Sequence, residues 1–112
     1  MIECTAHVPT TNGARYIEQL CKHWSHKLSV EHRAGHGVVK FEGDAMASMA
    51  ASNTELVVTI LANDKSTVER LGNVVAAHLD RFAFREAPLS FNWQTLHGEI
   101  DRSRSSERNP AS

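Results

Sequence analysis

Residues 56–82 read LVVTILANDKSTVERLGNVVAAHLDRF, and this stretch decides the fold class. Its first seven residues, Leu56 to Ala62, form a β-branched run that is typical of a central strand. Asn63-Asp64 ends that strand, and Ser66-x-x-Glu69 has the pattern of a capping box, which predicts the start of a long helix. Pro88 is expected to stop this helix. Apolar residues at helical spacing predict its buried stripe: Val68, Leu71, Val75, Leu79 and Phe82.

Upstream, a second amphipathic helix is predicted. Thr10, Thr11 or Asn12 can cap it, because each side chain can accept a hydrogen bond from a free backbone N–H. Before the cap, Cys4 to Val8 alternate weakly and end at Pro9, which indicates a short first strand. The apolar stripe of this helix has the spacing of a single helical face: Ile17, Leu20, Cys21, Trp24 and Leu28.

Four strands are predicted between the helices, with turn residues between them, at 28–31, 38–41, 45–51 and 56–62. The connections are short and therefore favour an antiparallel meander. After Pro88, alternation of apolar and polar residues over 89–94 predicts one more strand. The order β-α-β-β-β-β-α-β predicts an α+β domain of two layers, with both helices packed on one face of a curved antiparallel sheet.

Length and composition fit one domain, and we expect residues 1–97 to form it. Residues 98–112 are expected to be a disordered C-terminal tail, because almost no apolar residue follows Ile100. Twelve basic residues against thirteen acidic ones lack the basic excess of nucleic-acid binders. No apolar run is long enough to span a membrane, and no secretion signal begins the chain, so we expect a cytoplasmic protein. Cys4 and Cys21 fit no disulfide framework and are interpreted as free, buried thiols.

Two long motifs and the closing Phe91-Asn92-Trp93 resemble the bacterial family catalogued as domain of unknown function 2218. The motifs are RYIEQLCKHWSHK at residues 15–27 and HLDRFAFRE at residues 78–86, and the resemblance spans about residues 5–95. It implies no established activity. Some members of that family resemble a module appended to siderophore-interacting flavoproteins, which implies a link with iron handling. This chain carries no flavin-binding region.

The second helix carries the leading candidate site, formed by His78, Arg81 and Arg85. At offsets of three and seven residues these side chains would share one flank of the helix. Two guanidinium groups and an imidazole there could hold a carboxylate or a phosphate. In the alternative interpretation the arginines pair with Asp80 or Glu86, and His78 is a satisfied histidine at the edge of the core.

His23 and His26 are the candidates for a metal site, because residues three apart on a helix could share one ligand. They would need further donors, and Lys22 and Lys27 repel a cation. Surface histidines are the alternative. Cys21 points away from both and belongs to the core stripe. His32 and His36 flank a predicted hairpin turn and are interpreted as polar turn residues, although they could face each other across it.

The strand at 56–62 also predicts an open sheet face. If Leu56, Val58 and Ile60 face the helices, then Val57, Thr59 and Leu61 face the other way, where Val38 and Met46 could join them. We therefore expect a homodimer formed through the sheet.

The leading functional hypothesis is a non-enzymatic binding or accessory module for a small anionic or iron-siderophore-linked ligand. The rivals are an enzyme with His78 as general base, which needs a cleft and a carboxylate beside it, and a homodimeric interaction domain without a ligand. The chain has no Gly-x-Ser-x-Gly elbow and no phosphate-binding glycine loop, and its sequence identifies no cofactor.

Overall fold

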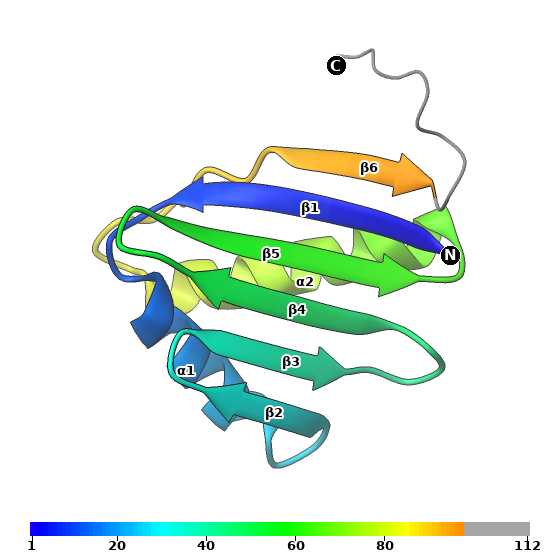
Figure 1. Ribbon diagram of the computed structural model, residues 1–112, viewed down its shortest axis with the longest axis horizontal. Coiled ribbons are helices and arrows are strands. Elements are labelled where there is room, and N and C mark those ends of the chain that lie inside the picture. Colours follow the sequence, from blue (N-terminus) through cyan, green and yellow to red (C-terminus); the bar gives the residue numbers. More distant parts are fainter. Residues whose placement is uncertain (98–112) are drawn as a thin grey trace.

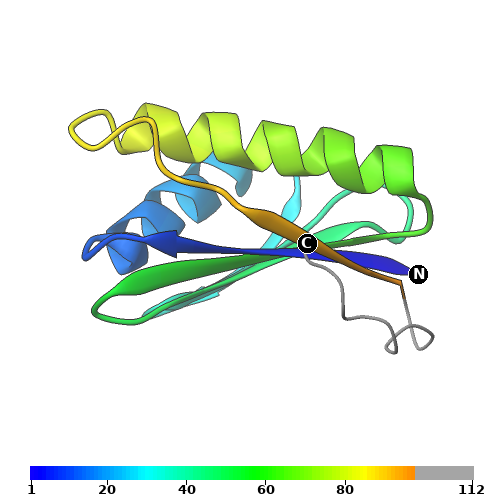
Figure 2. The same cartoon turned by 90° about the horizontal axis from the view of Figure 1, so that it is seen from above.

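The computed structural model describes residues 1–97, which form one antiparallel sheet covered by two helices on a single face (Figures 1 and 2). The elements are β1 Ile2–Pro9, α1 Gly13–Trp24, β2 Ser29–Arg33, β3 His36–Lys40, β4 Met46–Ala51, β5 Glu55–Ala62, α2 Lys65–Phe82 and β6 Trp93–His97. This order and the placement of both helices confirm the α+β architecture predicted from the sequence. Residues 98–112, for which a disordered tail is predicted, lie outside the described residues.

The strands lie in the order β2-β3-β4-β5-β1-β6, and every neighbouring pair is antiparallel. Strands β2 to β5 form the predicted meander, with positive backbone φ angles of 75° at Gly35 and 72° at Gly43 in its first two turns. Residues with a side chain rarely adopt such angles, so glycine suits both turns. The first strand then pairs with β5, which puts the N-terminal segment inside the sheet rather than at its edge.

Helix α1 is shorter than its apolar stripe suggested. It ends at Trp24, so Leu28 lies outside it and packs, half-buried, beside the start of β2. The predicted side-chain cap is also absent at the start of the helix. Asn12 occupies the cap position without a capping hydrogen bond, and its side-chain amide nitrogen donates to Glu86.

Helix α2 begins and ends at other residues than predicted. Its cap is Asp64, whose carboxylate accepts a hydrogen bond from the backbone N–H of Thr67 at 2.8 Å, while the Ser66 hydroxyl donates to the same carboxylate. The capping box predicted at Ser66 is therefore wrong. The helix ends at Phe82, well before Pro88, with the Ala83 N–H bonded to the Leu79 carbonyl.

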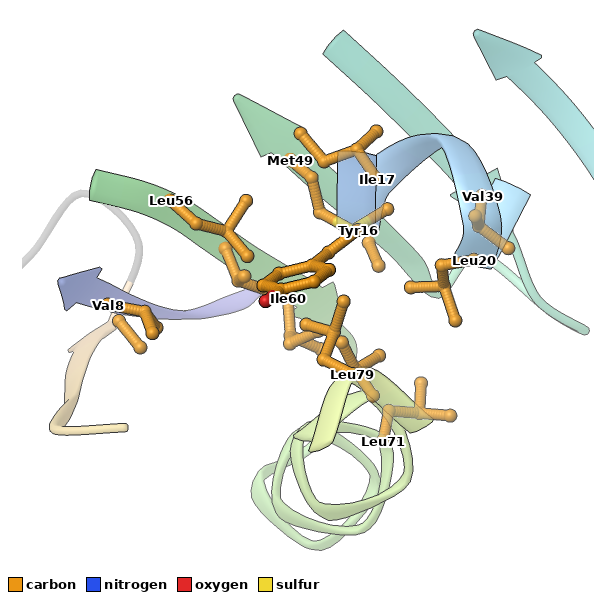
Figure 3. Packing of buried hydrophobic residues seen from close by; sticks show 14 of the residues in the cluster. Val8, Tyr16, Ile17, Leu20, Val39, Met49, Leu56, Ile60, Leu71 and Leu79 are labelled. Atoms are coloured by element: carbon orange, nitrogen blue, oxygen red, sulfur yellow. The ribbon is translucent and has the colours of Figure 1, made fainter. Parts of the chain in front are cut away.

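The core lies between the helices and the inner face of the sheet. Figure 3 shows Ile17 and Leu20 of α1 and Leu79 of α2 directed at the strand residues beneath them. In β5, Leu56, Val58 and Ile60 are fully buried, whereas the residues between them are only half-buried. Both cysteines are free and buried, as predicted, and burial raises the pKa of each thiol.

The last strand begins later than its sequence pattern indicated. Leu89 is buried and Phe91 half-buried, but both precede β6, which pairs with β1 from Trp93 onward. Phe91 and Trp93 stack with ring centroids 5.8 Å apart. Neither helix of the described chain has the length and apolar character that crossing a membrane requires.

Candidate functional site

An aromatic cluster fills the seam where the end of α1 meets the last turns of α2. The His78 ring lies 5.4 Å from the His23 ring and 4.9 Å from the Trp24 ring, measured between centroids. The Phe82 ring is edge-on to His23 at 6.0 Å, and Phe41 is edge-on to Trp24 at 5.4 Å. Only Trp24 is buried, while His78, Phe82 and Phe41 are half-buried and His23 is exposed. These five residues are called the seam cluster below.

One ring nitrogen of His78 is already bound. Its Nδ1 lies 2.8 Å from the carbonyl oxygen of Val74, one turn earlier in α2. A carbonyl only accepts, so Nδ1 must carry the proton. Within residues 1–97, Nε2 has no hydrogen-bond partner and is left to accept a hydrogen bond or, when protonated, to donate one. The seam cluster therefore offers a ligand one oriented imidazole nitrogen beside aromatic walls.

The two arginines of the predicted site do not share one helical ridge. Arg81 lies in the last turn of α2 and is exposed, three residues after His78. Because the helix ends at Phe82, Arg85 lies in the turn that follows and not two turns along the same flank. Its guanidinium group rests over the ring of Phe84, 5.7 Å from the centroid. His78 and Arg81 remain neighbours on α2, whereas the helical argument that joined Arg85 to them is wrong.

The acidic residues expected to pair with these arginines have other partners. Asp80 accepts a hydrogen bond from the Leu89 N–H at 2.8 Å. Glu86 accepts hydrogen bonds from Tyr16, Thr10 and Asn12. Across residues 1–97, neither Arg81 nor Arg85 forms an ion pair. The positive charge of Arg81 is therefore available to a ligand beside the seam cluster. The same charge interacts favourably with the negative C-terminal end of the α2 dipole.

Glu86 forms a polar cluster with residues far away in the chain, and no sequence pattern predicts it. Its carboxylate accepts from the Thr10 hydroxyl at 2.9 Å, from the Asn12 amide at 3.1 Å, and from the Tyr16 hydroxyl. The pKa of Glu86 is lowered by the hydrogen bond from Tyr16 and, to a smaller extent, by that from Asn12. The pKa of Tyr16 is raised by burial and then by its hydrogen bond to Glu86. A fixed carboxylate and a protonated phenol hold the α2–β6 loop against the start of α1.

The two predicted metal candidates, His23 and His26, are not ring neighbours within residues 1–97. His26 follows the end of α1 in an exposed turn, and the ring beside His23 is that of His78. In the part of the chain that the structure describes, no three His, Cys, Asp or Glu side chains are grouped so that they could hold a metal ion.

A shallow hollow of about 180 Å³ lies at the β2–β3 hairpin, away from the seam cluster. The hollow is open to solvent, and none of the seam-cluster residues lines it. The two histidines lie in adjacent rows of the hairpin, because His32 pairs with Gly37 and His36 pairs with Arg33. Side chains of adjacent rows point to opposite faces of the sheet, so His32 and His36 do not face each other. The residues lining the hollow are Glu31, His32, Arg33, His36, Gly37 and Val38.

The fold and the seam define a small two-layer α+β domain with an aromatic, histidine-containing surface between its helices. The chain belongs to the family described as an uncharacterized protein conserved in bacteria, domain of unknown function 2218, whose model matches residues 5–94. Among solved structures it is similar to the NMR structure of PA4090 from Pseudomonas aeruginosa, with 36% sequence identity and a TM-score of 0.73. That match covers 84% of this chain and 96% of PA4090. No curated protein matches the chain.

Proposed function

We propose that this protein is a cytoplasmic, non-enzymatic binding module for a small anionic ligand that carries an aromatic ring, of the kind found in iron-siderophore complexes. The observation that carries the proposal is His78: it is half-buried between two aromatic rings, and only one of its nitrogens has a partner in the described chain. The ring nitrogen without a partner in the described chain can form a hydrogen bond with a ligand that packs on the neighbouring rings.

Arg81 supplies the charge that such a ligand requires. A guanidinium group can bind a carboxylate or a phenolate pair through two parallel hydrogen bonds, and Arg81 has no acidic partner within residues 1–97. The rings of His23 and Phe82 offer faces or edges on which a ligand ring can pack. Arg85 and the exposed Phe84 beneath it lie on the next turn and could extend this surface.

Catalysis by His78 has less support than binding. A general base requires a substrate cleft, and the hollow described above lies at the β2–β3 hairpin and not beside His78. The carboxylate of Asp80, two residues away, accepts a hydrogen bond from the Leu89 N–H and, within residues 1–97, forms no hydrogen bond or ion pair with His78. Binding is therefore the better-supported role, and the resemblance of some family members to a module of siderophore-interacting flavoproteins favours a siderophore-type ligand.

Trp24 is a natural reporter for this site, because its ring packs against His78. The chain has two tryptophans, so Trp93→Phe leaves Trp24 as the only one. We expect the iron(III)–catechol complex to quench Trp24 fluorescence saturably and to raise the melting temperature. The gallium(III)–catechol complex should give the same rise, because the proposed contacts recognise charge and ring rather than the metal. Inorganic phosphate, which lacks a ring, should bind more weakly.

Variants locate the binding. Arg81→Ala should weaken binding of the gallium(III)–catechol complex about tenfold, the loss expected for a hydrogen bond to a charged group. His78→Phe keeps a ring in the seam but removes both nitrogens and should also weaken binding. Arg70→Ala is the matched control, because Arg70 is an exposed arginine earlier on the same helix. Equal affinities for the Arg81 and Arg70 variants, or no saturable binding by any probe, would show that the proposal is wrong.

A further inference from the structure

The face of the sheet opposite the helices is uncovered within the described chain. Figure 1 views the sheet from this side, with both helices behind it, and Figure 2 shows both on the far side. We call this surface the open face. Its central residues are half-buried and mostly apolar or small: Thr5, Val38, Met46, Ser48, Ala50, Val57, Thr59 and Leu61. Surfaces of this composition are commonly buried in protein–protein contacts.

Strand pairing arranges the open face in rows that run across the sheet. One row contains Lys40, Met46, Leu61 and Glu3, in spatial order from β3 to β1. The next contains Val38, Ser48, Thr59 and Thr5, with the two threonine hydroxyl oxygens 3.2 Å apart. The third contains His36, Ala50, Val57 and His7. In every row, the midpoint falls between β4 and β5.

Charge is distributed unequally between the two halves of this face. Arg33 and Lys40 lie on the β2–β3 half, together with one acid, Glu31. Glu3 and Glu55 lie on the half formed by β5 and β1, and Glu55 contacts His7 at 3.3 Å. No charged residue of β4 or of the middle of β5 separates the two halves. The open face is therefore complementary to itself if one half is laid over the other.

We infer that two copies of this chain pack open face to open face, related by a two-fold axis that runs parallel to the strands between β4 and β5. This rotation keeps each row in place and exchanges its ends. Lys40 then lies opposite Glu3 of the partner subunit, and Met46 opposite Leu61 of the partner subunit. Ser48 lies opposite Thr59 of the partner subunit. Packed sheets lie about 10 Å apart and cross at about 30°, offsets that a long lysine side chain can span.

The other in-plane two-fold, perpendicular to the strands, fits the charges less well. It exchanges the first and third rows instead of the two ends of each row, so that Lys40 lies opposite His36 of the partner subunit. The acidic half would then also lie over itself. Because like charges across a contact are unfavourable, the strand-parallel axis is the arrangement that the charges favour. A closed two-fold dimer of this kind uses one patch on both subunits.

The test is a charge exchange, followed by sedimentation equilibrium of the full chain at low salt. The unchanged protein should be a concentration-dependent dimer. Lys40→Glu alone and Glu3→Lys alone should each weaken it about tenfold, because each replaces two attractive pairs by two repulsive ones. The double variant Lys40→Glu/Glu3→Lys should recover the original dissociation constant, because the pairs are restored with exchanged signs.

Matched controls on the helix side are Lys22→Glu and Glu18→Lys, both at exposed positions of α1. They should leave the dimer unchanged. Leu61→Asp puts a charge beside the two-fold axis, opposite Met46 of the partner subunit, and should give a monomer. Its far-UV circular dichroism should show that the fold is retained. A monomeric unchanged protein, a double variant weaker than both single ones, or a dimer broken only by the helix-side changes would overturn the inference. Ligand binding at the helix seam can be measured in each variant separately.

Discussion

Glu86 joins parts of the chain that are far apart in sequence. Its hydrogen-bond donors Tyr16, Asn12 and Thr10 lie 70, 74 and 76 positions earlier. The Tyr16 and Thr10 side chains are buried, with 5% and 6% of each residue exposed, whereas Glu86 itself is exposed. The energetic weight of the cluster therefore lies in the buried hydroxyl groups, which cannot turn to water if their acceptor is removed.

We predict that Glu86→Ala lowers the free energy of unfolding by about 1–3 kcal/mol, the usual penalty for leaving buried donors unpaired. Tyr16→Phe should cost less, since the remaining carboxylate keeps Thr10, Asn12 and solvent as partners. Urea denaturation of both variants and of the double variant measures the coupling between them. The double variant should cost less than the sum of the two single changes. Strict additivity would contradict the proposed role of this hydrogen bond.

Sequence patterns could not reveal this cluster, and the reason is physical. A carboxylate followed by Ala87-Pro88 has the appearance of an ordinary polar loop, and its partners become neighbours only once β1, α1 and α2 have packed together. The same limit affected the predicted anion site. His78 and Arg81 were correctly placed on one helix, but the position of Arg85 depended on where that helix ends. The seam cluster joins His23 to His78, which periodicity within a single helix cannot predict.

Helix α1 lies close to the sheet because β3 carries a glycine beneath it. A Cβ atom at Gly37 would lie 2.6 Å from the Cys21 Sγ atom and 2.8 Å from the Ile17 Cγ2 atom, both closer than such atoms approach. Gly37 lies within β3 and not in the hairpin turn before it. Its structural role is to leave room for the buried stripe of α1.

We predict that Gly37→Ala destabilises the domain by about 1–3 kcal/mol through overpacking, despite the backbone entropy that alanine saves in the unfolded chain. Thermal and urea unfolding measure the loss. Cys21→Ala removes the closer of the two clashing atoms, so Gly37→Ala should cost less in that background. The Ile17 contact remains, and recovery should therefore be partial. An equal cost in both backgrounds would mean that contact with the helix does not explain the loss.

At the level of elements, the sequence predicted types and faces well but boundaries poorly. The stripe of α2 is buried at Val68, Leu71, Val75 and Leu79, because helical spacing alone determines which residues share a face. The predicted start of α2 is wrong because Asp64 and Ser66 are both good capping residues, and the Asp64 carboxylate accepts from both the Thr67 N–H and the Ser66 hydroxyl. Its end was misplaced because a proline sets a limit for a helix but does not require the helix to reach it.

The architecture of the whole molecule was the most predictable property. Short connections favour neighbouring antiparallel strands, and two apolar helix stripes need the same sheet face to bury against. The position of β1 between β5 and β6 could not be derived in this way, because it depends on pairing between the two ends of the domain. That pairing completes the open face, since Glu3 and Thr5 of β1 belong to its rows.

The stability of the whole domain should fall at both acidic and alkaline pH. Hydrogen bonds lower the pKa of Glu86 and of Asp64 below their ordinary values of 4.5 and 3.8. As the pH falls, these two carboxylates therefore bind protons first in the unfolded chain. The stability that they contribute above about pH 4.5 is lost on acidification. Burial raises the pKa of Cys4 and Cys21 above 9.0 and that of Tyr16 above 10.0. Stability present below pH 9 is accordingly lost as the pH rises, because the unfolded chain releases protons first.

Tyr16→Phe separates these contributions, because the Tyr16 hydroxyl takes part on both sides of the profile. We predict that the variant loses stability less steeply below pH 4.5, since the largest cause of the lowered Glu86 pKa is gone. Above pH 10 it should lack the tyrosine contribution and keep only that of the two thiols. Urea unfolding across the pH range gives both slopes, with Gln19→Ala, a change at an exposed position of α1 outside the Glu86 cluster, as the control. If the variant and the unchanged protein had parallel profiles, the hydrogen bond between Tyr16 and Glu86 would not be what links proton binding to folding.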